Sequence, residues 1–515
     1  MRRRSLATLI FGLTLGCGGA GEGGDGTGTE AGTPADLPPE IEPLTTVAET
    51  LVPCDVNRED LVGPGSWATN YGKSPELIAV PDGAGGLAIL AHDYTDLEQP
   101  GAWLLHLQPS VDDFVITAAF EPPMLDRIMG LVIDDDGEPI IASGIVEDLH
   151  QPLTTEYPAP GEYRSGVVRV VALDWAGGVD YDIDLDLARE AFDEPELLIN
   201  PMVAATSRMA HGAGMIALVH GINTDPDDAE VRHQKAISTQ LDARTGTVLR
   251  TSSIWVSHSF DQRVWHDGQG FVEAHLGDAY PRHIAFARVN PGASSGEYPL
   301  FHIKGPTGDN VTRSLLGDVA PIDEDPSYGF IALFVSERSE GTEALDPMHG
   351  NIAGARELAM VRIRRDFETV TDEAKQALDH LDPALPDTLS VESGETMRTN
   401  RVRWLTDYAA EGQGSVHAER PKLVAIGGDR YIALWEKWEL ADADATFAGT
   451  WAVALDAEGT ILAGPEQVSI GHLPRGDDAF VIDGQAGWLT GDSQMRQLRL
   501  YLLDETLNLR KITIE

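Results

Sequence analysis

Cysteine, basic residues and long apolar runs are all scarce in this sequence, and each scarcity excludes something. Only Cys17 and Cys54 occur among 515 residues, and if Cys17 is acylated no intramolecular disulfide can form. Lysine and arginine number 37 against 83 acidic residues, giving a formal net charge of -46. Such a surface repels phosphate backbones and anionic headgroups, which excludes nucleic acid as a partner. The apolar run near the N-terminus, residues 6–15, is too short to cross a bilayer.

Recognisable catalytic motifs are missing as well. The sequence has no Gly-x-Ser-x-Gly elbow, no His-Glu-x-x-His, no phosphate-binding Gly-rich loop with lysine, and no cysteine pairs for zinc. Hydrophobic residues nevertheless make up 42% of the chain, which is enough for a sizeable folded core. We therefore expect a folded protein whose function cannot be read from a short catalytic or metal-binding motif.

The N-terminus has the form of an export signal. Arg2, Arg3 and Arg4 precede the apolar run, and residues 13–17 read Leu-Thr-Leu-Gly-Cys. This stretch resembles the bacterial lipobox, which implies that residues 1–16 are a lipoprotein signal peptide and that Cys17 is lipidated. Leucine usually stands where this sequence has its threonine, and a secretory signal without lipidation is the alternative. The glycine after Cys17 implies, by the same resemblance, an outer-membrane or cell-surface location.

The next segment separates this anchor from the body of the chain. Residues 17–43 are rich in glycine, threonine and proline, and we expect a disordered tether there. The folded body is predicted to cover residues 44–515, so that the membrane is contacted through the lipid anchor only. We expect Cys54 to be a small, half-buried apolar residue and not a nucleophile.

One pattern recurs along the body: a short apolar strand, a turn with aspartate and glycine, and a second apolar strand that ends in a polar residue. Asp-Gly and Gly-rich turns supply the positive φ angles that tight hairpins need. The sequence contains seven copies, whose paired strands are predicted at 77–80 with 87–91, 128–133 with 140–141, 202–209 with 215–220, 264–265 with 271–275, 319–322 with 330–335, 423–426 with 431–436, and 480–482 with 486–490.

Most copies are followed by a second pair of apolar segments, which predicts four-stranded sheets. Such a sheet cannot bury both faces alone, whereas radial packing of several sheets covers them. We therefore predict an all-β fold, a β-propeller of four-stranded blades, seven in number within a range of six to eight. Two or more β-sandwiches in series are the alternative. From about Ser74 the repeats resemble the broad seven-bladed β-propeller superfamily and no single family within it.

Some segments depart from the repeat. Inserted loops are predicted near residues 149–165, 339–356 and 371–399, the last with a short helix at 372–381 followed by an acidic loop. Residues 240–249, Gln-Leu-Asp-Ala-Arg-Thr-Gly-Thr-Val-Leu, resemble a quinoprotein-type propeller repeat, and residues 454–462 form a partial copy. This resemblance implies a turn that locks neighbouring blades, not a quinone site.

No cofactor is identified, although the spacing of three acidic turns suggests calcium. Each turn lacks a complete ligand set, and solvated turns are the alternative. The turns contain residues 134–137, then Asp182, Asp184 and Asp186, and finally Asn223, Asp225, Asp227 and Asp228.

The fourth repeat carries the most unusual polar stretch, residues 257–283, which holds four of the 15 histidines. Histidine with aspartate and arginine can act as base, acid and charge stabiliser. His275, Asp278 and Arg282 are therefore candidate catalytic residues. The alternative is a buried polar latch, a charged network that pins strands near the central channel.

Polar residues also end each second strand of the repeats. Equivalent positions should lie at one height around the axis, so we expect these residues to crowd one rim and give it a negative potential. Trp435, Trp438 and Trp488 lie near the same ends, either in the core or stacked on a sugar ring. The predicted ligand-binding residues are His92, Asp93, Glu147, His220, His258, Asp261, Arg263, His275, Asp278, Glu337, Glu436 and Asp492.

Together these features predict a monomeric, non-enzymatic lipoprotein of the cell envelope. Its rim would bind a glycan, an envelope protein or a cation. The alternative is an extracytoplasmic hydrolase or lyase that uses the cluster in the fourth blade.

Overall fold

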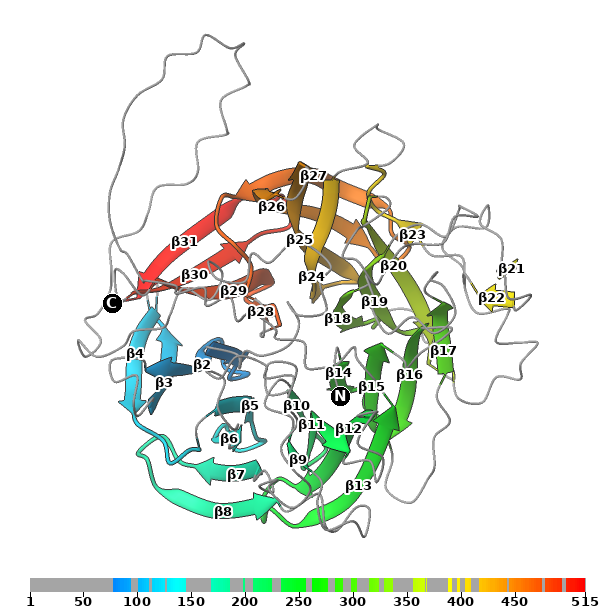
Figure 1. The fold of residues 1–515 in the computed structure, drawn as a ribbon. Coiled ribbons are helices and arrows are strands. Elements are labelled where there is room, and N and C mark those ends of the chain that lie inside the picture. The colour runs from blue at the N-terminus through cyan, green and yellow to red at the C-terminus, as the bar shows by residue number, and fades with distance from the viewer. Residues whose placement is uncertain are drawn as a thin grey trace, which may run out of the picture. The chain divides into compact units, whose positions relative to one another are not determined.

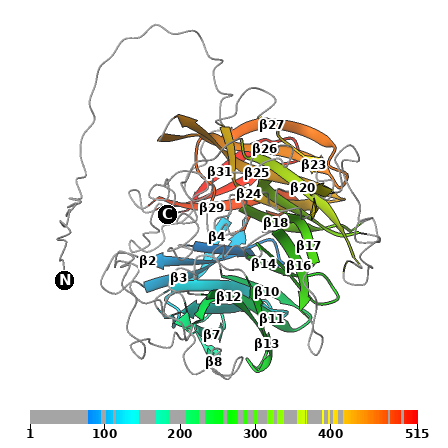
Figure 2. The ribbon, with the colours of Figure 1, turned by 45° about the vertical axis from the view of Figure 1, so that its right-hand side comes forward.

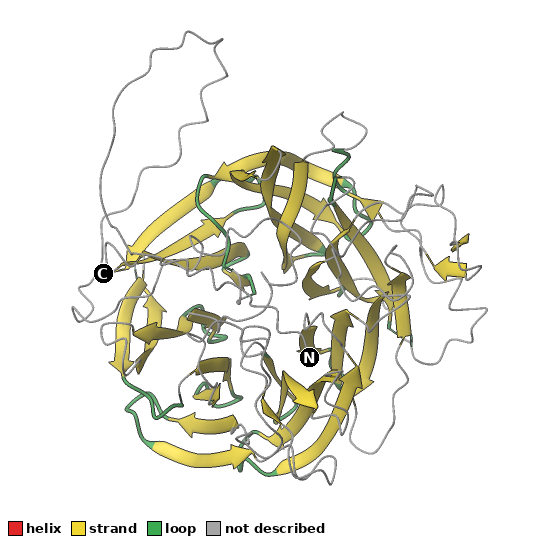
Figure 3. Ribbon diagram, in the orientation of Figure 1, coloured by secondary structure: helices red, strands yellow, loops and turns green. Residues whose placement is uncertain are grey.

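The computed structural model describes residues 77–93, 101–110, 114–125, 127–144, 168–185, 198–199, 207–224, 233–255, 262–276, 283–289, 298–302, 315–323, 328–336, 355–365, 367, 388–390, 396–398, 403–408, 416–441, 444–474, 478–492 and 497–514. These residues all belong to one compact unit, Pro38–Glu515, whereas a second unit, Met1–Leu37, lies outside the described residues. The described elements are strands (Figure 3), and within them no helix is long and apolar enough to span a membrane.

Aspartate builds many of the tight turns between neighbouring strands. After β1 (Leu77–Pro81), a carboxylate oxygen of Asp82 accepts hydrogen bonds from the amides two and four residues later, at 2.8 and 2.7 Å. Asp134, Asp174 and Asp504 hold their turns in the same way. An aspartate side chain can replace a backbone carbonyl in such a turn, which explains why the Asp/Gly pattern marks the hairpins.

Seven four-stranded antiparallel sheets follow one another along the chain, and each is a blade. Blade 1 is β1, β2 (Leu87–Asp93), β3 (Gly101–Pro109) and β4 (Phe114–Phe120). Blade 2 is β5 (Arg127–Ile133), β6 (Pro139–Gly144), β7 (Val168–Leu173) and β8 (Val179–Leu185). Blade 3 is β10 (Arg208–Gly212), β11 (Met215–Thr224), β12 (His233–Asp242) and β13 (Val248–Trp255), with β9 (Leu198–Ile199) paired to β11. Blade 4 is β14 (Gln262–His266), β15 (Phe271–Leu276), β16 (His283–Val289) and β17 (Tyr298–His302).

The last three blades have the same order. Blade 5 is β18 (Leu315–Pro321), β19 (Tyr328–Ser336), β20 (Glu357–Arg364) and β23 (Arg403–Trp404), and a separate hairpin of β21 (Thr388–Ser390) and β22 (Thr396–Arg398) precedes its last strand. Blade 6 is β24 (Val416–Gly427), β25 (Arg430–Ala441), β26 (Asp444–Asp456) and β27 (Ile461–Ser469). Blade 7 is β28 (Phe480–Ile482), β29 (Gln485–Asp492), β30 (Gln497–Leu503) and β31 (Leu509–Ile514).

The blades are arranged radially, and the colour runs once around the ring from β1 to β31 (Figures 1 and 2). The first strand of each blade contacts the first strand of the next, and β28 meets β1 again. First strands therefore surround the axis. The ring is closed by side-chain packing, because the described strands of blades 1 and 7 pair within their own blades while Ile89 and Leu500 share an apolar cluster.

Apolar clusters fill six interfaces between neighbouring blades, and within the described residues no such cluster joins blades 3 and 4. Strand alternation directs polar side chains from β12, β13 and β15 toward that interface. The side-chain amide of Gln240 crosses it by donating to the carbonyl of Val289. We call five of these residues the blade 3–4 seam: Ser238, Gln240, Arg250, Ser252 and Glu273.

Two glycine turns show how a blade locks onto the one before it. Gly246, with φ at 66°, lies so close to blade 2 that an added Cβ would be 2.8 Å from the Tyr181 ring. Gly459, with φ at 76°, lies close to blade 5, where an added Cβ would be 3.0 Å from the Met360 sulfur. These turns belong to the two quinoprotein-like stretches, and their contacts fit the blade-locking role which that resemblance implies.

The predicted seven-bladed, all-β propeller is confirmed, with some local corrections. The first strand of the third hairpin, predicted at 202–209, is Arg208–Gly212, because His211 and Gly212 continue the pairing up to a turn at residues 213–214. Strands β4, β16, β17 and β23 of the four-stranded blades were not predicted. The acidic loop predicted before residue 399 contains the β21–β22 hairpin, whereas the helix predicted at 372–381 lies outside the described residues.

Candidate functional site

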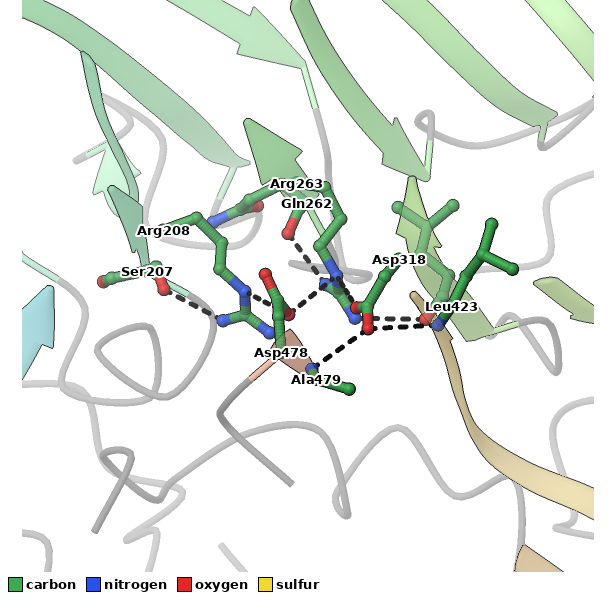
Figure 4. Close-up of polar contacts among 9 residues, drawn as sticks. Ser207, Arg208, Gln262, Arg263, Asp318, Leu423, Asp478 and Ala479 are labelled. Atoms are coloured by element: carbon green, nitrogen blue, oxygen red, sulfur yellow. Dashed lines mark hydrogen bonds and ion pairs between the residues drawn. The ribbon is translucent and has the colours of Figure 1, made fainter. Parts of the chain in front are cut away.

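Five charged residues lie in or just before the first strands of blades 3 to 7. Figure 4 draws four of them: Arg208, Arg263, Asp318 and Asp478. Arg208 opens β10, Arg263 is the second residue of β14, and Asp318 lies in β18. Lys422 lies in β24, and Asp478 comes two residues before β28. Because these first strands surround the axis, we call the five residues the axial cluster.

Two β-bulges place charged residues of blades 5 and 6 in this cluster. The pairing of β18 with β19 shifts register between Leu316 and Val319, and Asp318 lies within that bulge. The pairing of β24 with β25 shifts between Glu419 and Lys422. A bulge breaks the strict alternation of a strand and redirects its side chains, so strand periodicity does not reveal these two positions.

Two guanidinium groups converge on one carboxylate oxygen. The Nε of Arg208 donates to Oδ1 of Asp478 at 3.1 Å, and the Nε of Arg263 lies 3.4 Å from the same oxygen. The Nε of Arg263 also lies 3.4 Å from Oδ1 of Asp318. Asp478 therefore connects blades 3 and 4 to blade 7, and Arg263 is shared between two carboxyl groups.

Backbone carbonyls hold both guanidinium groups in place independently of Asp478. Arg208 donates through Nη1 to the carbonyl of Ser207 at 2.9 Å. Arg263 donates to the carbonyl of Gln262 at 2.8 Å and to that of Leu316 at 3.1 Å. Fixed donors of this kind form a preorganised seat for a negatively charged group.

Asp318 is anchored differently, through the backbone of the two following blades. Its Oδ2 accepts hydrogen bonds from the amides of Leu423 and Ala479, each at 3.3 Å. Since Leu423 belongs to blade 6 and Ala479 leads into blade 7, this buried carboxyl group joins three blades.

The pKa values of the two acids are pushed apart. Burial, together with the negative charge of Asp478, raises the pKa of Asp318 to about 7. Burial alone would raise the pKa of Asp478, but the charges of Arg208, Arg263 and Lys422 hold it far below its usual range. Burial lowers the pKa of Lys422 as well, against the opposing effect of both acids. Asp478 is therefore ionised near neutral pH, where Asp318 is partly protonated.

The side chain of Asp478 is more exposed to solvent than those of Arg263 and Asp318 in the axial cluster. Its side chain keeps 39% of its surface accessible, whereas Arg263 and Asp318 keep 8% and 6%. The Asp478 side chain is therefore more accessible than the groups that hold it.

Of the predicted site residues, only Arg263 lies in the axial cluster. It sits in a charged network of first strands near the axis, which is the arrangement described by the latch hypothesis for this stretch. His275, on the neighbouring strand, is fully buried. Their predicted companions His258, Asp261, Asp278 and Arg282 lie outside the described residues.

The residues predicted to form a polar rim are buried where the structure describes their side chains. His92 accepts the amide of Ile128 through Nε2 at 3.2 Å and so connects blades 1 and 2. Burial lowers the pKa of His220 to about 4. Glu147 and Glu337 lie outside the described residues, as do the side chains of Asp93 and Asp492. A ligand role for these residues stays a prediction.

Glu436, also predicted on the rim, is a buried junction in blade 6. It accepts hydrogen bonds from the backbone amide of Leu473 at 2.8 Å, the Trp438 indole at 2.9 Å and the Arg420 guanidinium at 3.1 Å. Burial would raise the pKa of Glu436, but Arg420 and His472 hold it below its usual value. Its oxygens are thus engaged in holding the blade together. The three tryptophans predicted near these ends are buried in the core: Trp435, Trp438 and Trp488.

Arg208, Asp318, Lys422 and Asp478 were not predicted as site residues. The start of a first strand lies opposite the end of its second strand, so a search extended across each hairpin would have reached Arg208, which pairs with Val219 beside His220. The bulges hide Asp318 and Lys422 from such a search.

Of the acidic segments considered for calcium, Asp134 lies in a turn, Asp182 lies in β8, and Asp225, Asp227 and Asp228 lie outside the described residues. Asp134 accepts two amides of its own turn at 2.9 Å, and Asp182 pairs with Arg169 across β7 and β8. In the described part of the chain, no group of three or more His, Cys, Asp or Glu side chains is placed to hold a metal ion. Calcium binding stays an untested expectation.

Comparison with known proteins gives structural similarity only. No protein-family model and no curated protein matches the chain. The BP39L lectin from Burkholderia pseudomallei is similar over 86% of this chain and 99% of its own, with 11% identity and a TM-score of 0.40. The GH43 endo-arabinanase from Bacillus licheniformis is similar over 64% of this chain and 95% of its own, with 10% identity and a TM-score of 0.28. A Trypanosoma rangeli sialidase is similar over 80% of this chain and 58% of its own, with 9% identity and a TM-score of 0.36. These values are too low to assign an activity.

Proposed function

We propose that this protein is a non-enzymatic binding protein whose axial cluster holds a polar ligand, with a glycan as the first class to test. The observation that carries the proposal is the convergence of charged side chains from four blades on Asp478, which leads into a fifth blade and which solvent can reach. Guanidinium donors and carboxylate acceptors stand side by side there. Adjacent donors and acceptors of this kind complement the neighbouring hydroxyl groups of a sugar.

Catalysis is the second candidate, because one specific observation favours it. Two acids whose environments drive their pKa values apart form a potential acid and base pair. However, both carboxyl groups contact the same guanidinium nitrogen of Arg263, each at 3.4 Å. Glycosidases keep their two carboxyl groups about 5 Å apart or more so that the sugar or a water fits between them. The shared arginine therefore favours binding over glycoside hydrolysis.

Arg208→Gln tests the binding proposal. It removes a guanidinium from the seat around Asp478, and we expect a ligand found on a glycan array to lose at least about tenfold in affinity, measured by calorimetry with the full chain in detergent. Arg169→Gln is the matched control, because Arg169 also pairs with an aspartate, but on the outer strands of blade 2. Equal binding by both variants would remove the axial cluster as the site. Release of new reducing ends from the bound glycan would favour the enzymatic candidate instead.

We further propose that the chain is exported and held in the bacterial envelope by a lipid on Cys17. The proposal is supported by Arg2, Arg3 and Arg4, the apolar residues 6–15 and the lipobox-like sequence that follows. Incorporation of labelled palmitate into the chain, and its loss in Cys17→Ser, is the expected result. Equal labelling of both forms would contradict it.

A further inference from the structure

The axial cluster contains a carboxylate-binding site formed by Arg208 and Arg263, which we call the seat. The side chain of Asp478 occupies it. Arg208 and Arg263 direct their Nε groups to one oxygen of Asp478, at 3.1 and 3.4 Å. Their remaining hydrogen bonds to the carbonyls of Ser207, Gln262 and Leu316 fix both guanidinium groups. The seat is therefore built by strands β10, β14 and β18 and does not depend on the group that occupies it.

The occupant differs from the seat in two respects. Arg208, Arg263 and Asp318 are strand residues, whereas Asp478 precedes β28 and belongs to no strand. Its side chain is also the more accessible one, at 39% against 9% for Arg208. A carboxylate outside the sheets can leave the seat without breaking a ladder hydrogen bond, while the two arginines cannot move without losing their carbonyl contacts.

We propose that Asp478 is an internal surrogate for the acidic group of the ligand, so that a saccharide carrying a carboxylate binds by replacing Asp478 between Arg208 and Arg263. This inference rests on the proposed function and names the ligand class of that site as acidic sugars. The exchange replaces one carboxylate by another, so the charge between the two guanidinium groups is conserved.

Charge conservation explains why the exchange suits an anion and not a neutral sugar. The buried Lys422 and Asp318 flank the seat, and both feel the charge of Asp478. A neutral ligand that displaced Asp478 would leave two buried arginines without that countercharge, which is costly in a desolvated site. A ligand carboxylate restores the pairing of one oxygen with the Nε groups of both arginines.

An internal surrogate lowers the apparent affinity, because the competent fraction of the protein is the fraction in which Asp478 has left the seat. Removing the surrogate should therefore strengthen binding of an acidic probe. We expect Asp478→Ala to bind a uronic acid oligosaccharide about tenfold more tightly than the unchanged protein. The carboxyl-reduced form of the same oligosaccharide should bind both proteins weakly and without this gain.

The measurement is titration calorimetry on the full chain with the acidic oligosaccharide and its reduced counterpart. Asp182→Ala is the matched control, since Asp182 also pairs with an arginine but on the outside of blade 2, and it should leave both affinities unchanged. Asp478→Asn is the second variant, used if the alanine variant fails to fold, because it removes the charge and keeps the volume.

The outcomes separate this inference from the proposed function. Tighter binding of the acidic probe by either Asp478 variant supports it. Weaker or unchanged binding, or equal affinity for the acidic and the reduced probe, overturns it while leaving the site itself intact. If Arg208→Gln lost all binding of the acidic oligosaccharide and Asp478→Ala did not bind it more tightly, the proposed function would stand. The role of Asp478 as an internal surrogate would then be rejected.

Discussion

The axial cluster and the blade 3–4 seam each contain a carboxyl group whose pKa is raised to about 7, mainly by burial, but the contacts of the two groups differ. Asp318 in the axial cluster has partners: it accepts two backbone amides and lies 3.4 Å from the Arg263 guanidinium. Burial and the charge of Asp478 together raise the pKa of Asp318. Glu273 in the seam is raised by burial, which Ser238 and Arg250 offset only in part.

Asp318 and Glu273 also differ in their hydrogen bonds. Both carboxylate oxygens of Glu273 are buried without a hydrogen-bond partner, and so is the hydroxyl oxygen of Ser252. A buried acid without hydrogen bonds to its ionised form is held neutral by its surroundings. The comparison teaches that similar pKa values can arise in a carboxyl group anchored by two backbone amides and in one on which burial is only partly offset by its neighbours. Stability measurements distinguish the two.

Asp318→Ala should have the larger effect on stability. The substitution leaves the amides of Leu423 and Ala479 without their acceptor and removes a buried countercharge of Arg263. Breaking a buried pair from one side costs about 3–5 kcal/mol. Urea unfolding followed by tryptophan fluorescence measures the free energy of unfolding of this variant and of the unchanged protein, at a pH of about 8, where Asp318 is mostly ionised.

The isosteric variant Asp318→Asn is the control for this measurement. It keeps an oxygen that can accept hydrogen bonds from the two amides. We therefore expect its free energy of unfolding to fall by less than half as much as that of the alanine variant. If the alanine variant were as stable as the unchanged protein, Asp318 would not anchor blades 6 and 7, and the contrast with Glu273 would disappear.

The sequence predicted the blades well because their signals are local. Asp82 and Asp134 hold turns within a few residues of themselves, so the hairpins can be recognised from short segments. The axial cluster is different, because Arg208 and Asp478 are 270 residues apart and meet only when the ring closes. The bulges at Asp318 and Lys422 further remove these residues from the alternating pattern of their strands.

The residues predicted on the polar rim are buried where the structure describes their side chains, for a related reason. A polar residue at the end of a strand is expected to face solvent, but neighbouring blades cover the strand ends of a propeller. His92 and Glu436 instead satisfy backbone amides of the next blade or loop. The sequence gives no sign of which strand ends are covered, since the cover comes from residues far along the chain.

Glu273→Gln should have the smaller effect, and one that depends on pH. The pKa of Glu273 is about 7 in the folded protein and about 4.5 without burial, so the folded state binds more protons than the unfolded state between these values. The free energy of unfolding therefore falls as the pH rises through this window and levels off above it. Glutamine keeps the neutral shape, so the variant should match the unchanged protein near pH 5 and exceed it by up to about 3 kcal/mol near pH 8.

Urea unfolding of both proteins at these two pH values measures the difference, in which the titration of all other groups cancels. Glu466→Gln on the exposed strand β27 removes a carboxylate in the same way and should leave the difference near zero. A gain at pH 8 that is confined to the seam variant would show that burial raises the pKa of Glu273 in the folded protein. If Glu273→Gln lost stability at both values, the carboxylate would have to be ionised and paired in the seam, and the two buried acids would then belong to one class.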